Sequence, residues 1–135
     1  MGKPTFSIKD DEIEIGMGIH GEPGIEVRPM MDADAVASLL LSKILADLPL
    51  ASGDEVSVMV NGLGATPLEE LLIVYRSLHI SLSALGVSLV MPHVGEFATS
   101  MEMAGLSVTV IKLDAELKAL LRAPASTPFY TNENK

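Results

Sequence analysis

His20 is the side chain of this sequence best placed to do chemistry, because it lies among four glycines and a proline in residues 16–24. Neutral imidazole is both a nucleophile and a base near neutral pH. Glycines on either side let the backbone turn sharply and approach a ligand closely. The pattern predicts a functional histidine, with a histidine that only hydrogen-bonds a turn as the alternative. Glu22 is near, but one His and one Glu make a weak ligand set, so no metal site is predicted.

Other polar features give weaker signals. The Gly-x-Gly turn at residues 62–64 precedes an expected helix, where an anion could bind. It lacks the Gly-Lys-Ser/Thr of a P-loop and the third glycine of a dinucleotide fingerprint, so a tight connection is favoured and no nucleotide site is predicted. His79 falls on an apolar helix stripe and is interpreted as a core or interface histidine. His93 stands where a strand is expected to end, as many α/β sites do, and stays a secondary candidate.

The elements that must position His20 follow from hydrophobic periodicity. Residues 12–15 alternate and predict a strand, paired in a hairpin with residues 5–9 across a turn at Asp10 and Asp11. Residues 32–48 predict a helix that is capped by Asp32.

The middle of the chain predicts a strand, a helix and a second strand. The first strand is expected at residues 55–61 and the second at residues 87–91, which implies a right-handed parallel crossover. Between them, Thr66, Pro67 and Glu69 resemble a capping box, opening a helix that runs to about residue 85. The inner face of this helix is predicted to be Leu68, Leu71, Leu72, Tyr75, Leu78 and Leu82.

Towards the C-terminus, residues 97–104 predict a short helix and residues 107–113 a strand. Asp114 is expected to cap a last helix, whose inner face would be Leu117, Leu120 and Leu121. The whole pattern predicts one α/β domain over residues 1–124, with helices packed on a mixed, mostly parallel sheet. Residues 125–135 are predicted to be a flexible tail.

Composition narrows the function classes. The chain has 135 residues, 18 acidic against 9 basic side chains and a net charge of −9, which argues against nucleic acid and against an anionic membrane surface. It has no cysteine, no apolar run that could span a bilayer and no signal-peptide pattern, so a cytoplasmic protein is predicted. Apolar residues make up 48% of this short chain. Either a second chain covers part of that surface, or the aliphatic core is unusually well packed.

Three blocks of the sequence resemble the K subunit or K domain of dihydroxyacetone kinases, in the order of that family. The first is residues 14–24, EIGMGIHGEPG, which matches the family's substrate-histidine motif. The second is residues 60–71, VNGLGATPLEEL, and the third is residues 99–105, TSMEMAG. Together the blocks span most of the chain, and the first is the most specific.

The resemblance implies that His20 holds dihydroxyacetone covalently, as a hemiaminal on a ring nitrogen, for phosphorylation. It also implies that Gly18, Gly21 and Glu22 belong to the substrate-binding loop. A nitrogen nucleophile adds to a ketone but not to glycerol, and the bond orients the substrate hydroxyl for phosphoryl transfer.

The family K unit is about twice as long as this chain, so the resemblance also implies missing parts. The N-terminal half would supply the catalytic Asp base, and a separate L subunit would carry ATP, or ADP with magnesium, so no cofactor is expected on this chain. Alone, the chain would be inactive, and it is expected to form a homo- or hetero-oligomer. The alternative is a non-catalytic K-like sensor or regulator that binds the ketone or a partner protein. A third interpretation is a structural domain with a vestigial histidine loop.

Overall fold

A computed structural model describes residues 7–133 of the chain. No helix in this part of the chain is long and apolar enough to cross a membrane. The described residues form three helices and eight strands. In chain order these are β1 (Glu12–Ile15), β2 (Glu26–Pro29), α1 (Ala33–Asp47), β3 (Glu55–Gly64), α2 (Leu68–Ala84), β4 (Ser88–Leu89), β5 (His93–Gly95), β6 (Ala104–Leu113), α3 (Ala115–Arg122), β7 (Ala125–Ser126) and β8 (Thr131–Asn132).

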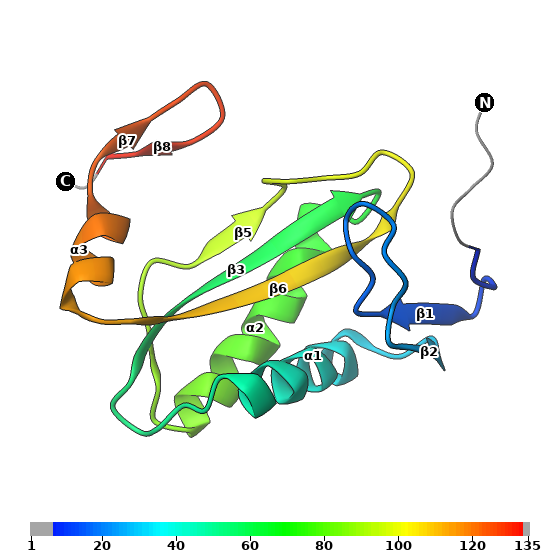
Figure 1. Cartoon of the computed structure of the whole chain (residues 1–135), viewed down its shortest axis with the longest axis horizontal. Coiled ribbons are helices and arrows are strands. Elements are labelled where there is room, and N and C mark those ends of the chain that lie inside the picture. The colour runs from blue at the N-terminus through cyan, green and yellow to red at the C-terminus, as the bar shows by residue number, and fades with distance from the viewer. Residues whose placement is uncertain (1–6, 134–135) are drawn as a thin grey trace.

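The main sheet is built on β3 (Figure 1). The antiparallel strand β6 follows one edge of β3 along all ten of its residues. The short strands β4 and β5 pair with the other edge, both parallel to β3. The predicted α/β class, the mixed and mostly parallel sheet and the parallel β3–α2–β4 connection are therefore confirmed.

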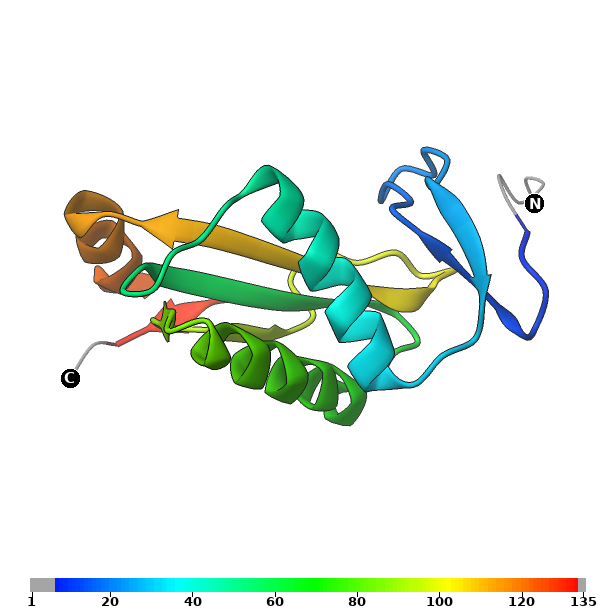
Figure 2. The same cartoon turned by 90° about the horizontal axis from the view of Figure 1, so that it is seen from below.

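The core lies on one face of this sheet, where α1 and α2 pack (Figure 2). Val56, Val58 and Val60 point into it from β3 and are fully buried. Alternate residues of a strand face opposite sides, so the three valines form one row on the helix-facing side of β3. Burying each such side chain contributes roughly 1.5–3 kcal/mol to folding. The described residues place no helix over the middle of the other face.

The two long helices begin differently. In α1, Asp32 caps as predicted, because its Oδ1 accepts a hydrogen bond from the Ala35 N–H at 2.8 Å. In α2, the predicted capping box is wrong. Pro67 is the N-cap residue, in an extended conformation and without a side-chain cap, so Thr66 lies outside the helix.

The inner face of α2 is turned relative to the prediction. Leu68 and Leu72, which were expected inside, are 51% and 48% exposed. The face that packs on the sheet follows a spacing of three and four residues, as a helix requires. Its buried members are Leu71, Val74, Ser77, Leu78 and Leu82.

The N-terminal hairpin pairs differently from the prediction. Strand β1 pairs antiparallel with β2, with Glu12 opposite Pro29 and Ile15 opposite Glu26. Of the predicted partner, residues 5–6 lie outside the described range and residues 7–9 form no strand, so that pairing is wrong. The Asp10–Asp11 turn leads into β1, and the segment that closes the hairpin is the glycine-rich one.

The predicted helix at residues 97–104 is wrong, because residues 96–103 are an irregular loop and β6 already begins at Ala104. At the C-terminal end, Asp114 caps α3 as predicted through the Leu117 N–H, at 2.7 Å. The expected inner face of α3 is wrong, since none of its residues is buried. Beyond α3, within the segment predicted as a flexible tail, β7 and β8 form a short hairpin.

Candidate functional site

The His20 loop joins β1 to β2 and is closed at its base by hydrogen bonds. The Ile25 N–H donates to the Ile15 carbonyl at 2.8 Å, and the Gly24 N–H donates to Glu14 Oε1 at 2.7 Å. Gly16, at the first bend, has φ +80°, a left-handed conformation that side-chain-bearing residues rarely adopt. The glycines thus allow a loop of defined conformation between the two strands of a short hairpin.

At the tip of the loop, the chain makes one tight turn around His20. The Gly21 N–H donates to the Gly18 carbonyl at 2.9 Å, and Gly21 takes φ +83°. This turn leaves the His20 side chain 85% exposed. An exposed imidazole on a fixed backbone is accessible to a small molecule or to a second protein surface.

Glu22 is the side chain that contacts His20. Its Oε2 accepts the His20 backbone N–H at 3.1 Å, and its Oε1 lies 3.4 Å from His20 Nδ1. Hydrogen bonds from the backbone N–H groups of Glu22 itself and of His20 hold the pKa of the Glu22 carboxyl below its ordinary value. Glu22 therefore stays ionised beside the ring at neutral pH. Glu22 was placed near His20 from the sequence, but this contact was not predicted.

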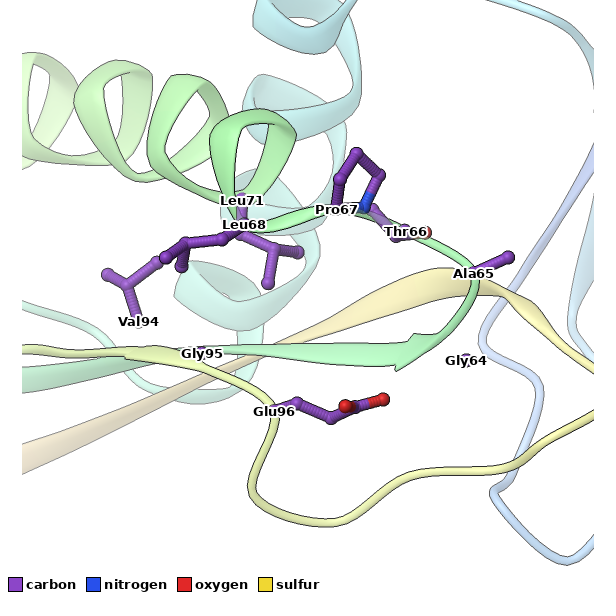
Figure 3. Close-up of a pocket in the computed structure, with 9 residues that line it drawn as sticks. All are labelled: Gly64, Ala65, Thr66, Pro67, Leu68, Leu71, Val94, Gly95 and Glu96. Atoms are coloured by element: carbon purple, nitrogen blue, oxygen red, sulfur yellow. The ribbon is translucent and has the colours of Figure 1, made fainter.

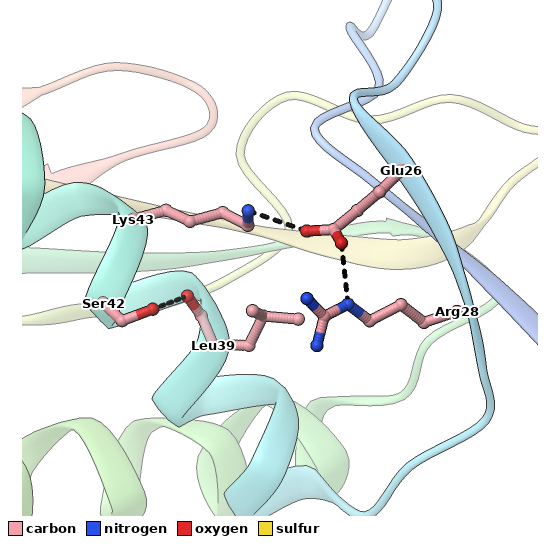
Figure 4. Close-up of polar contacts among 5 residues, drawn as sticks. All are labelled: Glu26, Arg28, Leu39, Ser42 and Lys43. Carbon is pink, nitrogen blue, oxygen red and sulfur yellow. Dashed lines mark hydrogen bonds and ion pairs between the residues drawn. The ribbon is translucent and has the colours of Figure 1, made fainter.

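The hairpin is joined to the helical layer by an ion pair (Figure 4). Glu26 of β2 accepts from Lys43 of α1 at 2.7 Å and from Arg28 of β2 at 2.8 Å. These bonds from Lys43 and Arg28 lower the pKa of the Glu26 carboxyl. Both overall views place the hairpin at the end of the sheet where β3 ends and β6 begins (Figures 1 and 2).

The other two histidines lie apart from His20 and share no contact with it in the described part of the chain. His93 opens β5, and its Nε2 lies 2.8 Å from the Tyr130 hydroxyl, while its ring meets Phe97 edge-on. His79 is exposed and stacks edge-on with Tyr75, so it is not a core histidine, and the alternative of an interface histidine stays a prediction. Among the described residues, no three His, Asp or Glu side chains are grouped to hold a metal ion.

A hollow of about 400 Å³ lies where β3 ends and α2 begins (Figure 3). It includes the Gly-x-Gly turn considered above as an anion site, but its lining carries the carboxylate of Glu96 and no Lys or Arg. The lining residues are Gly64, Ala65, Thr66, Pro67, Leu68, Leu71, Val94, Gly95 and Glu96.

Asn61, which sequence reasoning missed, fixes the loop that forms one wall of this hollow. Its Oδ1 accepts the N–H groups of Phe97 and Ala98 at 2.8 and 2.9 Å, and its Nδ2 donates to the Ala98 carbonyl at 2.7 Å. The loop is fastened again at Gly64, whose N–H donates to Thr99 Oγ1 at 2.8 Å. A single buried amide thus pairs three backbone groups of a segment that forms no helix or strand.

Comparison with known proteins gives one consistent family. The Dak1 domain profile matches residues 1–129. Over 129 residues, the chain is 43% identical to the dihydroxyacetone-binding subunit DhaK of PTS-dependent dihydroxyacetone kinase 2 from Listeria innocua, a match that covers 96% of this chain and 39% of that subunit. It is 45% identical over 131 residues to L-erythrulose kinase from Pectobacterium atrosepticum, covering 94% of this chain and 22% of that enzyme.

A solved structure repeats the fold. The dihydroxyacetone kinase operon co-activator Dha-DhaQ superposes with a TM-score of 0.82 at 30% identity, over 90% of this chain and 38% of that one. The chain thus spans well under half the length of each of these relatives. The profile match and the relatives agree with the three sequence blocks, and the chain therefore belongs to the Dak1 domain family, as a DhaK-type domain.

Proposed function

We propose that this chain is the substrate-anchoring half of a dihydroxyacetone kinase and that His20 binds the ketone as a hemiaminal. The observation that carries the proposal is the exposed His20 imidazole on a fixed glycine turn. Its support from relatives is the 43% identity to a subunit described as dihydroxyacetone-binding. In this proposal, Gly18 and Gly21 shape the substrate loop, and Glu22 completes it.

The chemistry needs only groups that the loop presents. The lone pair of a His20 ring nitrogen forms a bond to the carbonyl carbon, and the π pair of the C=O bond moves onto the oxygen, which takes a proton from water. The ring, cationic after the attack, returns to neutrality by losing its other N–H proton to water. A ketone or aldehyde enters this reaction, whereas glycerol has no carbonyl to attack.

The phosphoryl transfer itself requires parts that lie outside this chain. We assign the general base to an N-terminal K half, and the donor, ATP or ADP with magnesium, to an L-type subunit. The coverage of 39% and 22% of two relatives leaves room for such parts. The working protein is then a homo- or hetero-oligomer in the cytoplasm, and the chain alone does not turn over.

The substrate class extends to short ketoses beyond dihydroxyacetone. One relative that is 45% identical is named an L-erythrulose kinase. Erythrulose has the same hydroxyketone end as dihydroxyacetone, and the addition at His20 requires only that group.

A second candidate function is a regulator that binds the ketone or a partner without transferring phosphate. Its support is the TM-score of 0.82 with a protein titled a kinase operon co-activator. Both functions keep the His20 adduct, so the adduct does not separate them. The two functions are separated by mixing the chain with an N-terminal half, an L subunit and its phosphoryl donor. A kinase then yields a ketose phosphate, whereas a regulator leaves the ketone unphosphorylated.

The adduct is tested with dihydroxyacetone labelled with ¹³C at its carbonyl carbon. We expect the labelled carbon of the bound molecule to move from the ketone region of the NMR spectrum to that of a carbon with four single bonds. The signal should vanish in His20→Ala and persist in His79→Ala, which removes another exposed imidazole. If the wild-type chain forms no adduct even with an N-terminal half present, covalent capture is excluded.

A further inference from the structure

We propose that Glu22 is a positioning residue, which holds the His20 ring with its proton on Nδ1 and so leaves the Nε2 lone pair free to attack a carbonyl. The value of this tautomer for catalysis rests on the function proposed above. The tautomer itself is a property of the loop and is measurable without any substrate.

The first support is the two-point contact. One carboxylate oxygen of Glu22 holds the His20 backbone N–H at 3.1 Å, and the other faces Nδ1 at 3.4 Å. In the described part of the chain, no protein group bonds Nε2. The two ring nitrogens are therefore distinguished: Nδ1 lies beside the Glu22 carboxylate, and Nε2 has no such contact among the described residues.

The second support is that Glu22 is itself fixed. Its carbonyl accepts the Gly18 N–H at 3.0 Å. A Cβ atom on Gly18 would lie 2.0 Å from Glu22 Oε2, a separation that real atoms do not tolerate. Gly18 is thus required so that the Glu22 side chain can fold back over the turn towards His20. This gives the motif's second glycine a specific role.

The third support is charge. An ionised carboxylate only accepts hydrogen bonds, so a bond between Glu22 and His20 Nδ1 requires the proton on Nδ1. A histidine side chain in water prefers the opposite tautomer, with its proton on Nε2. The same carboxylate also stabilises the positive charge that the ring acquires when Nε2 bonds to carbon, as the buried aspartate does in a Ser-His-Asp triad.

The test reads the tautomer directly, from ¹⁵N chemical shifts and long-range couplings of the His20 ring in the full chain at a pH where the ring is neutral. We expect the Nδ1–H form to dominate in the wild type. Glu22→Ala should shift the ratio towards the Nε2–H form by roughly 2- to 10-fold, the ratio that corresponds to one net hydrogen bond. Glu102→Ala, at an exposed loop position, should leave the ratio unchanged.

A second variant covers the case in which Glu22→Ala disorders the loop. Gly18→Ala leaves the carboxylate in the chain but displaces it, so it should shift the ratio in the same direction. Its control is Gly105→Ala, where the nearest atom to the new Cβ lies at 3.9 Å. A wild-type ring that carries its proton mainly on Nε2, or a ratio that neither variant changes, would overturn the proposal.

Failure here is distinct from failure of the proposed function. A ring held in the Nδ1–H form that captures no ketone leaves the positioning role intact and excludes the kinase anchor. An adduct that forms on a ring without tautomer preference supports the kinase anchor and excludes the positioning role of Glu22. If both proposals hold, Glu22→Ala slows adduct formation at least in proportion to the fall in the fraction of His20 rings that carry the proton on Nδ1.

Discussion

The β1–β2 hairpin and the β3–α2 layer are stabilised in opposite ways. The β3–α2 layer depends on side chains that the water does not reach, such as Val58 and Leu78, both fully buried. The hairpin has one buried apolar residue, Ile15, which is 5% exposed, and it depends on backbone hydrogen bonds and the Glu26–Lys43 ion pair. The exposed His20 loop belongs to the hairpin, so hydrogen bonds and an ion pair hold it in place.

This difference means that one region, the core, provides the stability of the fold, while the other, the hairpin, carries the side chain proposed to react. Hydrophobic burial dominates the free energy of folding, whereas an exposed hairpin contributes little. Changes in the core should therefore unfold the chain without altering the geometry of the loop in the molecules that remain folded. Changes in the loop should alter the geometry while the core stays folded. Three predictions test this separation.

The largest expected effect is on the core. Leu78→Ala should lower the free energy of unfolding by about 2–5 kcal/mol, because it removes a fully buried side chain and leaves a cavity. Leu72→Ala, six residues earlier on the same helix and 48% exposed, should cost less than about 1 kcal/mol. Denaturant unfolding measures both, and equal losses would contradict the buried face described for α2.

A smaller effect is expected where the two regions meet. Lys43→Ala removes the ion pair with Glu26 and should cost about 0–1 kcal/mol, because such partly exposed pairs are weak. Amide hydrogen exchange should then rise by up to about 5-fold in β1 and β2 and stay unchanged in β3. Lys9→Ala, which breaks the Lys9–Glu12 pair, serves as a control that leaves the α1 contact intact. Faster exchange throughout the sheet would show that the regions are coupled.

The smallest expected effect is on how the stability of the His20 loop depends on pH. Because the folded loop lowers the pKa of Glu22, the loop is stabilised above the ordinary carboxyl pKa and loses that stabilisation as the pH falls through the lowered value. The ¹³C shift of the Glu22 carboxyl should titrate below its ordinary range, and Gly18→Ala should move the midpoint upwards. An unchanged midpoint in that variant would show that the loop geometry does not lower the pKa of Glu22.

Sequence reasoning succeeded where the controlling contact is local. The caps at Asp32 and Asp114 each involve a backbone N–H three residues away, so the residue type alone was informative. Strand β3 was predicted from its alternating valines, although it extends to Gly64. The glycines around His20 indicated a sharp exposed turn, and the structure has one.

It failed where a distant residue decides. The 97–104 segment was predicted as a helix, but the N–H groups of Phe97 and Ala98 are bound by Asn61, 36 and 37 residues earlier. In the same way, the partner of β1 is decided by the closure of the glycine loop onto β2 and not by the Asp10–Asp11 turn. Glu22 was identified as a loop residue, but its contact with the ring depends on Gly18 having no side chain.

Asn61 has a further consequence, which concerns the chemical ageing of the chain. It is followed by Gly62, and an asparagine before glycine is the arrangement most prone to deamidation, in which the next backbone nitrogen attacks the side-chain amide. Here Asn61 is extended within β3, 3% exposed, and both ends of its amide are hydrogen-bonded. The folded strand therefore protects the amide from attack. Conversion to aspartate in an unfolded chain would put a carboxylate oxygen in place of the amide nitrogen that donates to the Ala98 carbonyl, and the repulsion between the two oxygens would oppose refolding.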